Sequence, residues 1–252
     1  MTSMKKTLLL AILSLSLYIF SCTKESEGIS VITVDIDFVY NDSAFVINKI
    51  YDYPLDYDLK IEQLKLYLSN VYLKKENGQI IPLSSIRFID ASAEGNKINV
   101  QIPEGVYNKF AYSIGVPQEL NGTQNPDFDA ALYSSDHPLS LNNGMYWTWA
   151  SGYRFVLLDG RVNTDPTVDE EFETLLSIHT GKEYSYRSKE LPIQLSAAED
   201  AQVHLSLVFD VEKFLAGDSD VIDIAVDNQS HGTNEALANR LSDNVVNAVS
   251  IQ

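Results

Sequence analysis

Cysteine is almost absent from this chain of 252 residues, in which Cys22 is the only one. A disulfide within the chain is therefore excluded. Basic residues are also scarce, because 18 Lys and Arg stand against 35 Asp and Glu and give a formal net charge of −17. A chain this acidic repels the phosphates of nucleic acids and the headgroups of anionic bilayers. We therefore expect no nucleic-acid partner, and no membrane contact through the folded surface itself.

The apolar run from Leu8 to Phe20 is too short to span a bilayer as a stable helix. It follows two lysines and ends two residues before Cys22, an arrangement typical of a bacterial lipoprotein signal peptide. We expect residues 1–21 to be removed, the Cys22 thiol to carry the lipid, and residues 22–28 to form a flexible tether. The mature protein is then anchored in the cell envelope, facing the periplasm or the cell exterior. The alternative is an ordinary thiol in an uncleaved anchor.

Several motifs of catalysis are missing as well. The chain has no GxSxG elbow, no Walker loop and no dinucleotide-binding loop. Its many carboxylates include no pair that spacing alone would fix for glycoside hydrolysis. The acidic run Asp218-Ser219-Asp220 lacks the glycine and the terminal glutamate of an EF-hand loop. We therefore expect a protein that is not an enzyme.

What the chain has in quantity is short, alternating apolar segments. Residues 29–40 alternate cleanly, and Asn77-Gly78 supplies the positive φ angles that a tight hairpin needs between two further strands. A last strand is expected at 222–226, followed by a helix with Thr233 as its N-cap. No Pro-, Gly- or Ser-rich linker divides residues 29–252. The pattern predicts one all-β domain, an antiparallel β-sandwich with long loops and a C-terminal helix.

Both tryptophans, Trp147 and Trp149, lie in one aromatic stretch, residues 143–160. With a period of two, they share a strand face with further large apolar side chains, and the strand is either continuous or bent at Ser151-Gly152. Burial of that face would contribute several kcal/mol at ~25 cal/mol per Å² of apolar surface. We expect the stretch to lie at the centre of a sheet, with the core packed on its aromatic face.

The four histidines are His137, His179, His204 and His231, and no two of them have the short spacing of a local metal motif. Any metal site must therefore be assembled from distant segments. A single histidine is more often an ordinary, partly exposed imidazole. His179 is the strongest candidate ligand because it ends a predicted buried strand. We also expect it to lie near His137 or His231, since all three stand at the ends of strands or of the helix.

The run NGMYWTWASGYRFVLLDG resembles the MbnP-like family of copper-associated extracytoplasmic proteins. Gly115-Val116-Pro117 and Leu120-Asn121 before it, and Ile178-His179-Thr180-Gly181 after it, match the same family pattern. The resemblance implies one copper ion held by two imidazoles and by kynurenine, an oxidised tryptophan made by a partner dihaem enzyme of the MauG type.

By position, His179 matches the family's HxG histidine, and Trp147 or Trp149 matches the modified tryptophan. The second imidazole is His137 or His231, ahead of His204. In one branch of the family a histidine lies two residues after the kynurenine, and here Trp149 stands at that place after Trp147. The resemblance thus leaves the second ligand open.

A function of another class is a structural or glycan-recognising surface lipoprotein without metal. Both tryptophans would then pack in the core or stack on sugars. Exposed indoles near the long loop at 116–143 favour that alternative, whereas buried indoles beside imidazoles favour copper.

Overall fold

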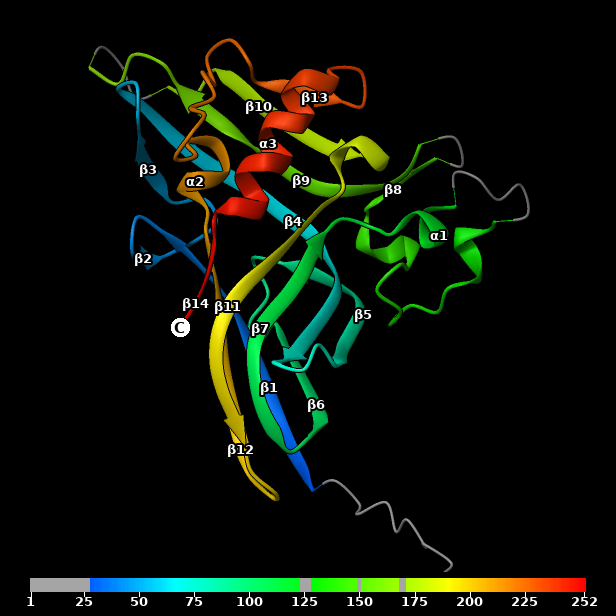
Figure 1. Ribbon diagram of the computed structural model, residues 1–252. Coiled ribbons are helices and arrows are strands. Elements are labelled where there is room, and N and C mark those ends of the chain that lie inside the picture. Colours follow the sequence, from blue (N-terminus) through cyan, green and yellow to red (C-terminus); the bar gives the residue numbers. More distant parts are fainter. Residues whose placement is uncertain (1–27, 123–127, 149–150, 168–170) are drawn as a thin grey trace, which may run out of the picture.

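The computed structural model describes residues 28–122, 128–148, 151–167 and 171–252 (Figure 1). Its first sheet is organised around β1 (Ile29–Tyr40), whose alternating pattern buries Ile32, Val34 and Ile36. β1 pairs in parallel with β12 (Gln202–Asp210). The other strands of this sheet are β2 (Ser43–Ala44), β6 (Lys97–Pro103) and β14 (Val249–Ile251).

The second sheet is larger and is built around β4 (Tyr57–Lys75) and β9 (Gly152–Asn163), which are antiparallel neighbours. Its main path runs through β11 (Arg187–Ala197), β7 (Gly105–Ile114), β4, β9, β10 (Thr174–Gly181) and β13 (Gln229–His231). Three more strands pair with this path, namely β3 (Ile50–Tyr53), β5 (Ile80–Asp90) and β8 (Tyr146–Thr148). The predicted hairpin is confirmed, with Gly78 at φ 87° between β4 and β5.

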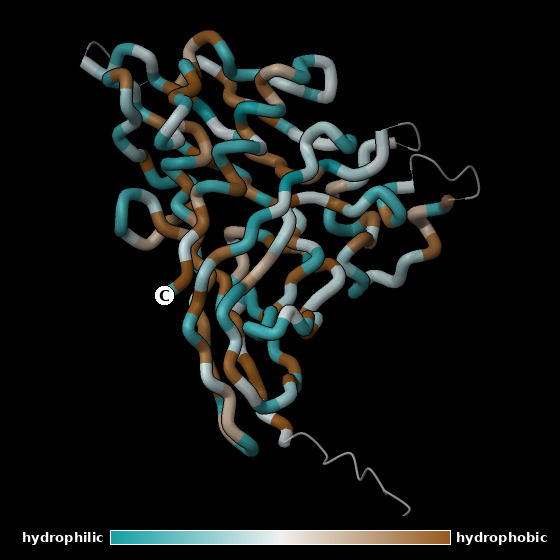
Figure 2. Tube along the Cα trace, viewed as in Figure 1, coloured by the Kyte–Doolittle hydropathy of each residue, from teal (hydrophilic) through white to brown (hydrophobic). Residues whose placement is uncertain are grey.

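The inner faces of the two sheets meet in the main hydrophobic core, and Figure 2 shows hydrophobic segments along the strands of both. The helices are α1 (Gln118–Asn121), α2 (Glu212–Leu215) and α3 (Glu235–Asn247), with 3-10 turns at Ala130–Leu132, Leu141–Asn143 and Glu183–Ser185. The helix α3 packs against β10 and β11. The all-β sandwich with a C-terminal helix is therefore confirmed.

Two details near the C-terminus differ from the expectation. The N-cap of α3 is Asn234, whose side chain accepts a hydrogen bond from the backbone N–H of Leu237 at 3.1 Å, so Thr233 was one residue too early. The strand expected at 222–226 is wrong. Residues there form a turn in which the N–H groups of Val226 and Asp227 donate to the Asp223 carbonyl, so the backbone is satisfied locally instead of in a sheet.

The aromatic stretch forms two strands, β8 and β9, with a bend at Gly152, where φ is 68°. As expected, β9 is central in its sheet, but its aromatic face does not meet the main core. The side chains of Val156 and Leu158, on the opposite face of β9, are buried in the main core instead. The aromatic face packs in a second cluster on the outer side of the sheet, beneath the loop that follows β7; its buried members are Tyr67, Ile86, Val116, Ala130, Leu139, Met145, Tyr153, Phe155 and Leu157. Both faces of β9 are buried, so its pattern alone could not assign them.

The expected signal peptide 1–21, the Cys22 lipidation site and all but the last residue of the tether 22–28 lie outside the described residues, as does Trp149. In the part of the chain that the structure describes, no helix is long and apolar enough to cross a membrane.

The burial of β9 can be tested with a truncated side chain. Leu158 is 0% exposed, whereas Leu132 in the outer loop is 82% exposed. We expect Leu158→Ala to lower the free energy of unfolding by about 2–5 kcal/mol through lost burial and a cavity. Leu132→Ala should change it by less than about 0.5 kcal/mol. Urea unfolding followed by circular dichroism measures both, and equal effects would contradict the assigned core.

Candidate metal centre

Strand register collects four polar side chains on the outer face of the second sheet. Ser177 and His179 are two residues apart on β10, so both side chains point to that face. Asp159 of β9 is the direct partner of Ser177, and His231 of β13 is the direct parallel partner of His179. Residues 52 positions apart in the sequence are thus brought side by side by three hydrogen-bonded strands.

A β-bulge at Thr180 fixes the end of β10 beside this group. The pairing of β10 with β9 shifts between His179 and Gly181, and the buried Thr180 hydroxyl accepts a hydrogen bond from the Val156 N–H at 3.1 Å. Bulges of this kind bend a strand and redirect its side chains. Here the hydroxyl of the bulged residue has its hydrogen bond within the protein. The fold therefore fixes the direction of the His179 side chain.

The four side chains form a short hydrogen-bond network. Asp159 Oδ1 lies 2.8 Å from His179 Nε2 and 2.6 Å from Ser177 Oγ. Ser177 Oγ lies 2.9 Å from His231 Nε2. The two imidazole rings are 4.9 Å apart between centroids, with an interplanar angle of 72°. The expected proximity of His179 to one of its two candidate partners is thus observed, and the partner is His231.

Trp147 borders this network. Its ring centroid lies 6.0 Å from that of His179, and the Arg154 guanidinium lies over the indole at 5.0 Å. The six-membered edge of the indole lies against Gly181 and Gly232, because a Cβ at either glycine would be 3.3 to 3.5 Å from it. Each site histidine is thus followed closely by a glycine on which the indole rests. The side chain of Trp147 is half-buried.

Burial and hydrogen bonding shift the pKa values of Asp159 and His231. Burial alone would raise the pKa of Asp159, but hydrogen bonds from His179 and Ser177 outweigh it and lower that pKa below its usual value. His231 is exposed on one side, yet the partial burial of its ring and the neighbouring His179 lower its pKa. An ionised carboxylate therefore stands beside an imidazole whose neutral form is favoured.

Two nitrogen atoms of the site, Nε of Arg154 and Nδ1 of His179, are buried without a hydrogen-bond partner. Only the imidazole nitrogen can act as a ligand, because a guanidinium has no lone pair to offer. The residue His179 is 7% exposed, so its Nδ1 has no access to a solvent partner either. A buried polar atom without a partner costs about 1–3 kcal/mol. Such an atom is explained when it serves as a ligand atom for a bound group.

The other histidines lie elsewhere. His137 is held within the outer loop, where its ring stacks on Tyr133 at 4.1 Å and its Nδ1 accepts the Leu139 N–H at 3.0 Å. His204 is exposed on β12, in the opposite sheet. Neither makes a ring contact or hydrogen bond with His179 or His231 within the described chain.

Sequence reasoning missed Asp159, Ser177 and Arg154. The first and the last stand in the aromatic stretch, and Ser177 precedes His179 by two residues, so a face-by-face comparison of β9 and β10 could have found them. Among the residues described, no three or more His, Cys, Asp and Glu side chains are arranged to hold a metal ion together.

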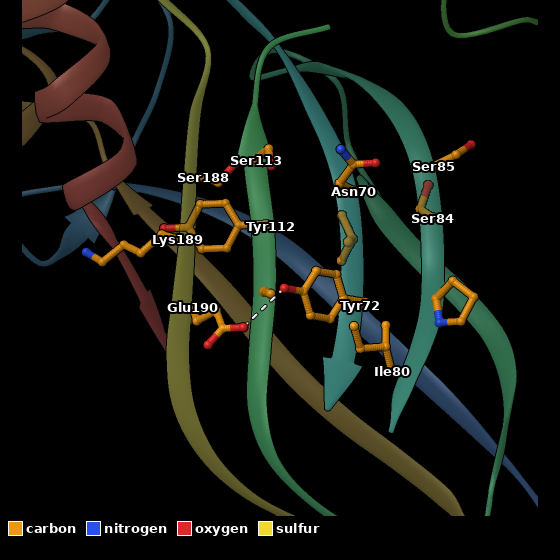
Figure 3. Close-up of a pocket in the computed structure, with 13 residues that line it drawn as sticks. Asn70, Tyr72, Ile80, Ser84, Ser85, Tyr112, Ser113, Ser188, Lys189 and Glu190 are labelled. Carbon is orange, nitrogen blue, oxygen red and sulfur yellow. Dashed lines mark hydrogen bonds between the residues drawn. The ribbon is translucent and has the colours of Figure 1, made fainter. Parts of the chain in front are cut away.

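A groove of about 520 Å³ lies elsewhere, on the outer face of β5, β4, β7 and β11 (Figure 3). Serine hydroxyls, Tyr72 and Glu190 line it, and the Tyr72 hydroxyl donates to Glu190 at 3.1 Å. No tryptophan or histidine is among its lining residues. The groove therefore does not combine with Trp147 into a sugar-stacking surface.

The fold and the cluster together define a class: a β-sandwich protein with a candidate metal centre of two imidazoles and an adjacent indole on one sheet.

The chain belongs to the MbnP family, whose family model matches residues 30–235. Among solved structures it is similar to MbnP from Methylosinus trichosporium, with a TM-score of 0.53 and 13% identity over 88% of this chain and 98% of that one. At this identity the likeness shows a shared fold. No curated protein matches the chain.

The contact between Trp147 and Gly181 can be tested by adding one methyl group. A Cβ at Gly181 would lie 2.9 Å from the Tyr153 carbonyl oxygen and 3.3 Å from the indole of Trp147, so Gly181→Ala must displace its neighbours. In a Trp149→Phe background we expect the fluorescence of Trp147 to shift to longer wavelength. Gly95→Ala is the control for backbone strain: its Cβ would meet nothing within 4 Å, but its φ of 74° disfavours alanine, so it should leave the emission of Trp147 unchanged. Unchanged emission in Gly181→Ala would contradict the contact.

Proposed function

We propose that this protein is a lipid-anchored, extracytoplasmic copper-binding protein without catalytic activity, and that His179, His231 and an oxidised Trp147 hold the copper. The observation that carries the proposal is the pairing of two imidazoles beside Trp147, with Nδ1 of His179 buried and lacking a partner. Membership of the MbnP family, which is associated with copper and methanobactin, supports the same metal.

The residues present fit copper in their chemistry. Imidazole nitrogen is a suitable ligand for copper. Asp159 accepts a hydrogen bond from His179 on the ring edge away from Nδ1, as carboxylates commonly do behind metal-binding histidines. Core packing alone leaves the orphaned Nδ1 unexplained, so the metal accounts for a feature that a purely structural role does not.

An unmodified indole offers no usable lone pair, which is why the proposal includes its oxidation. Cleavage of the C2–C3 bond is a four-electron oxidation that adds two oxygen atoms, supplied by one dioxygen or by two hydrogen peroxide molecules that leave two waters, and it gives N-formylkynurenine. Water then hydrolyses the formamide, which releases C2 as formate and leaves kynurenine. The product carries an aryl amine and a ketone, which supply donor atoms next to His179. A dihaem partner enzyme of the MauG type would supply the oxidising equivalents. Trp147 is preferred because it contacts the site, whereas Trp149 lies outside the described residues.

Copper binding tests the proposal directly. We expect His179→Ala and His231→Ala to weaken Cu(I) binding by more than about 100-fold, beyond the ~10–100-fold cost of losing a residue that only orients a ligand. In protein from the native host, the peptide that contains Trp147 should have the mass expected when kynurenine replaces tryptophan. Trp147→Phe should abolish high-affinity binding. Competition with a chromophoric Cu(I) chelator and peptide mass spectrometry measure these effects.

The matched controls are His137→Ala and His204→Ala, which remove imidazoles outside the cluster. Both should bind Cu(I) as the parent protein does. If the controls lose as much affinity as the site variants, or if Trp147 is unmodified and Trp147→Phe binds normally, the proposed copper site is wrong.

The anchor is tested separately. Lipid attached to the Cys22 thiol would hold the acidic domain on a membrane that its own charge does not favour. We expect the parent protein to sediment with membranes and to incorporate a labelled fatty acid, and Cys22→Ala to do neither. Incorporation of label into the Cys22→Ala variant would exclude this residue as the lipid site.

A further inference from the structure

The Nε2 atoms of both imidazoles face the oxygen atoms of Asp159 and Ser177, and His179 Nε2 also lies 3.4 Å from Ser177 Oγ. His179 Nε2 is 2.8 Å from Asp159 Oδ1, and His231 Nε2 is 2.9 Å from Ser177 Oγ. Which nitrogen of each ring carries the hydrogen therefore depends on the roles of Asp159 and Ser177.

Those roles follow from counting hydrogens. Asp159 is a carboxylate, which is ionised near neutral pH as aspartate ordinarily is, and an ionised carboxylate can only accept hydrogen bonds. Ser177 lies 2.6 Å from Asp159 Oδ1, so its single hydroxyl hydrogen must be donated to the carboxylate. The serine oxygen is then left only with lone pairs, and it can only accept a hydrogen bond from His231.

Both Nε2 atoms must therefore be donors. In the neutral imidazole the other ring nitrogen, Nδ1, then bears the lone pair. The surroundings of the Nδ1 atoms agree with this assignment. Nδ1 of His179 is buried without a partner, and Nδ1 of His231 makes no hydrogen bond to the rest of the described chain.

We propose that Asp159 and Ser177 are positioning residues that hold His179 and His231 in the Nε2–H tautomer, so that each ring presents Nδ1 as its metal-binding atom. Asp159 accepts a hydrogen bond from His179 directly. It orients His231, on β13, through the hydroxyl of Ser177. The metal-binding part of this inference rests on the proposed copper function, whereas the tautomers are a property of the metal-free protein.

The tautomers can be read by NMR without copper. In ¹⁵N-labelled metal-free protein, long-range ¹H–¹⁵N correlations should show a protonated Nε2 and an unprotonated Nδ1 in both rings. Ser177→Ala should shift His231 towards a mixture of tautomers, because His231 loses its acceptor at 2.9 Å. His179 should stay in the Nε2–H form, because it keeps Asp159 at 2.8 Å and loses only the longer contact of 3.4 Å with Ser177 Oγ. Asp159→Asn should disturb both rings, since the amide no longer compels donation from His179 or Ser177.

His137 is the internal reference. Its Nδ1 accepts a backbone N–H from Leu139, so it should remain in the Nε2–H form in each variant. Ser206→Ala is the matched control, because Ser206 Oγ donates to Asp37 Oδ2 at 2.5 Å in a similar serine–aspartate pair that contacts neither site histidine. Neither ring of the site should change in that variant.

Cu(I), added anaerobically to protein from the native host in which Trp147 is modified, is the metal probe, and its closed shell keeps the spectra sharp. We expect the Nδ1 resonances to move and the Nε2 protons to remain, and Ser177→Ala to weaken Cu(I) binding by about 10–100-fold while Ser206→Ala does not. An Nδ1–H tautomer in either ring of the metal-free protein, or loss of the Nε2 protons on Cu(I) addition, overturns the inference. The expected tautomers without any copper binding would instead overturn the proposed function and leave the tautomer assignment standing.

Discussion

The parallel pairing of β10 with the short strand β13 is the constraint on which the candidate site depends. It places His231 directly beside His179, although the two residues are 52 positions apart. A three-residue edge strand has few hydrogen bonds of its own. Its position is reinforced by α3, which begins four residues after β13 and packs against β10 and β11. The helix therefore helps to form the site without contributing a ligand.

The second hydrophobic cluster makes the other half of the site possible. Tyr153, Phe155 and Leu157 pack on the outer face of β9, under the loop that also contains Met145. Because that packing fixes the β8–β9 hairpin against the sheet, the indole of Trp147 is held beside Gly181 and Gly232. Arg154, which lies over the ring, donates from Nη1 to the Gly144 carbonyl at 2.8 Å and ties the hairpin to the loop.

The polar network shows how a mostly apolar sandwich can hold two imidazoles on one face of a sheet. One carboxylate, Asp159, receives hydrogen bonds from His179 and from Ser177, and its negative charge is therefore compensated on two sides. The same bonds leave one ring nitrogen of His179 free and buried. The groups that satisfy the hydrogen-bonding capacity of the carboxylate therefore also orient the two proposed ligands.

The sequence alone determined the class of the fold, because strand periodicity, the Asn77-Gly78 turn and the amphipathic C-terminal segment depend on neighbouring residues only. It also singled out His179 as the strongest candidate ligand and left Trp147 and Trp149 as alternatives, through the local pattern around them. Only the tertiary structure decided that His231, and not His137, lies beside His179, since strand pairing between distant segments leaves no local trace. For the same reason Asp159 and Ser177 emerged only from the register of β9 with β10. The direction of the aromatic face was likewise undecidable locally, because both faces of β9 are buried and a period of two does not say which core each face meets.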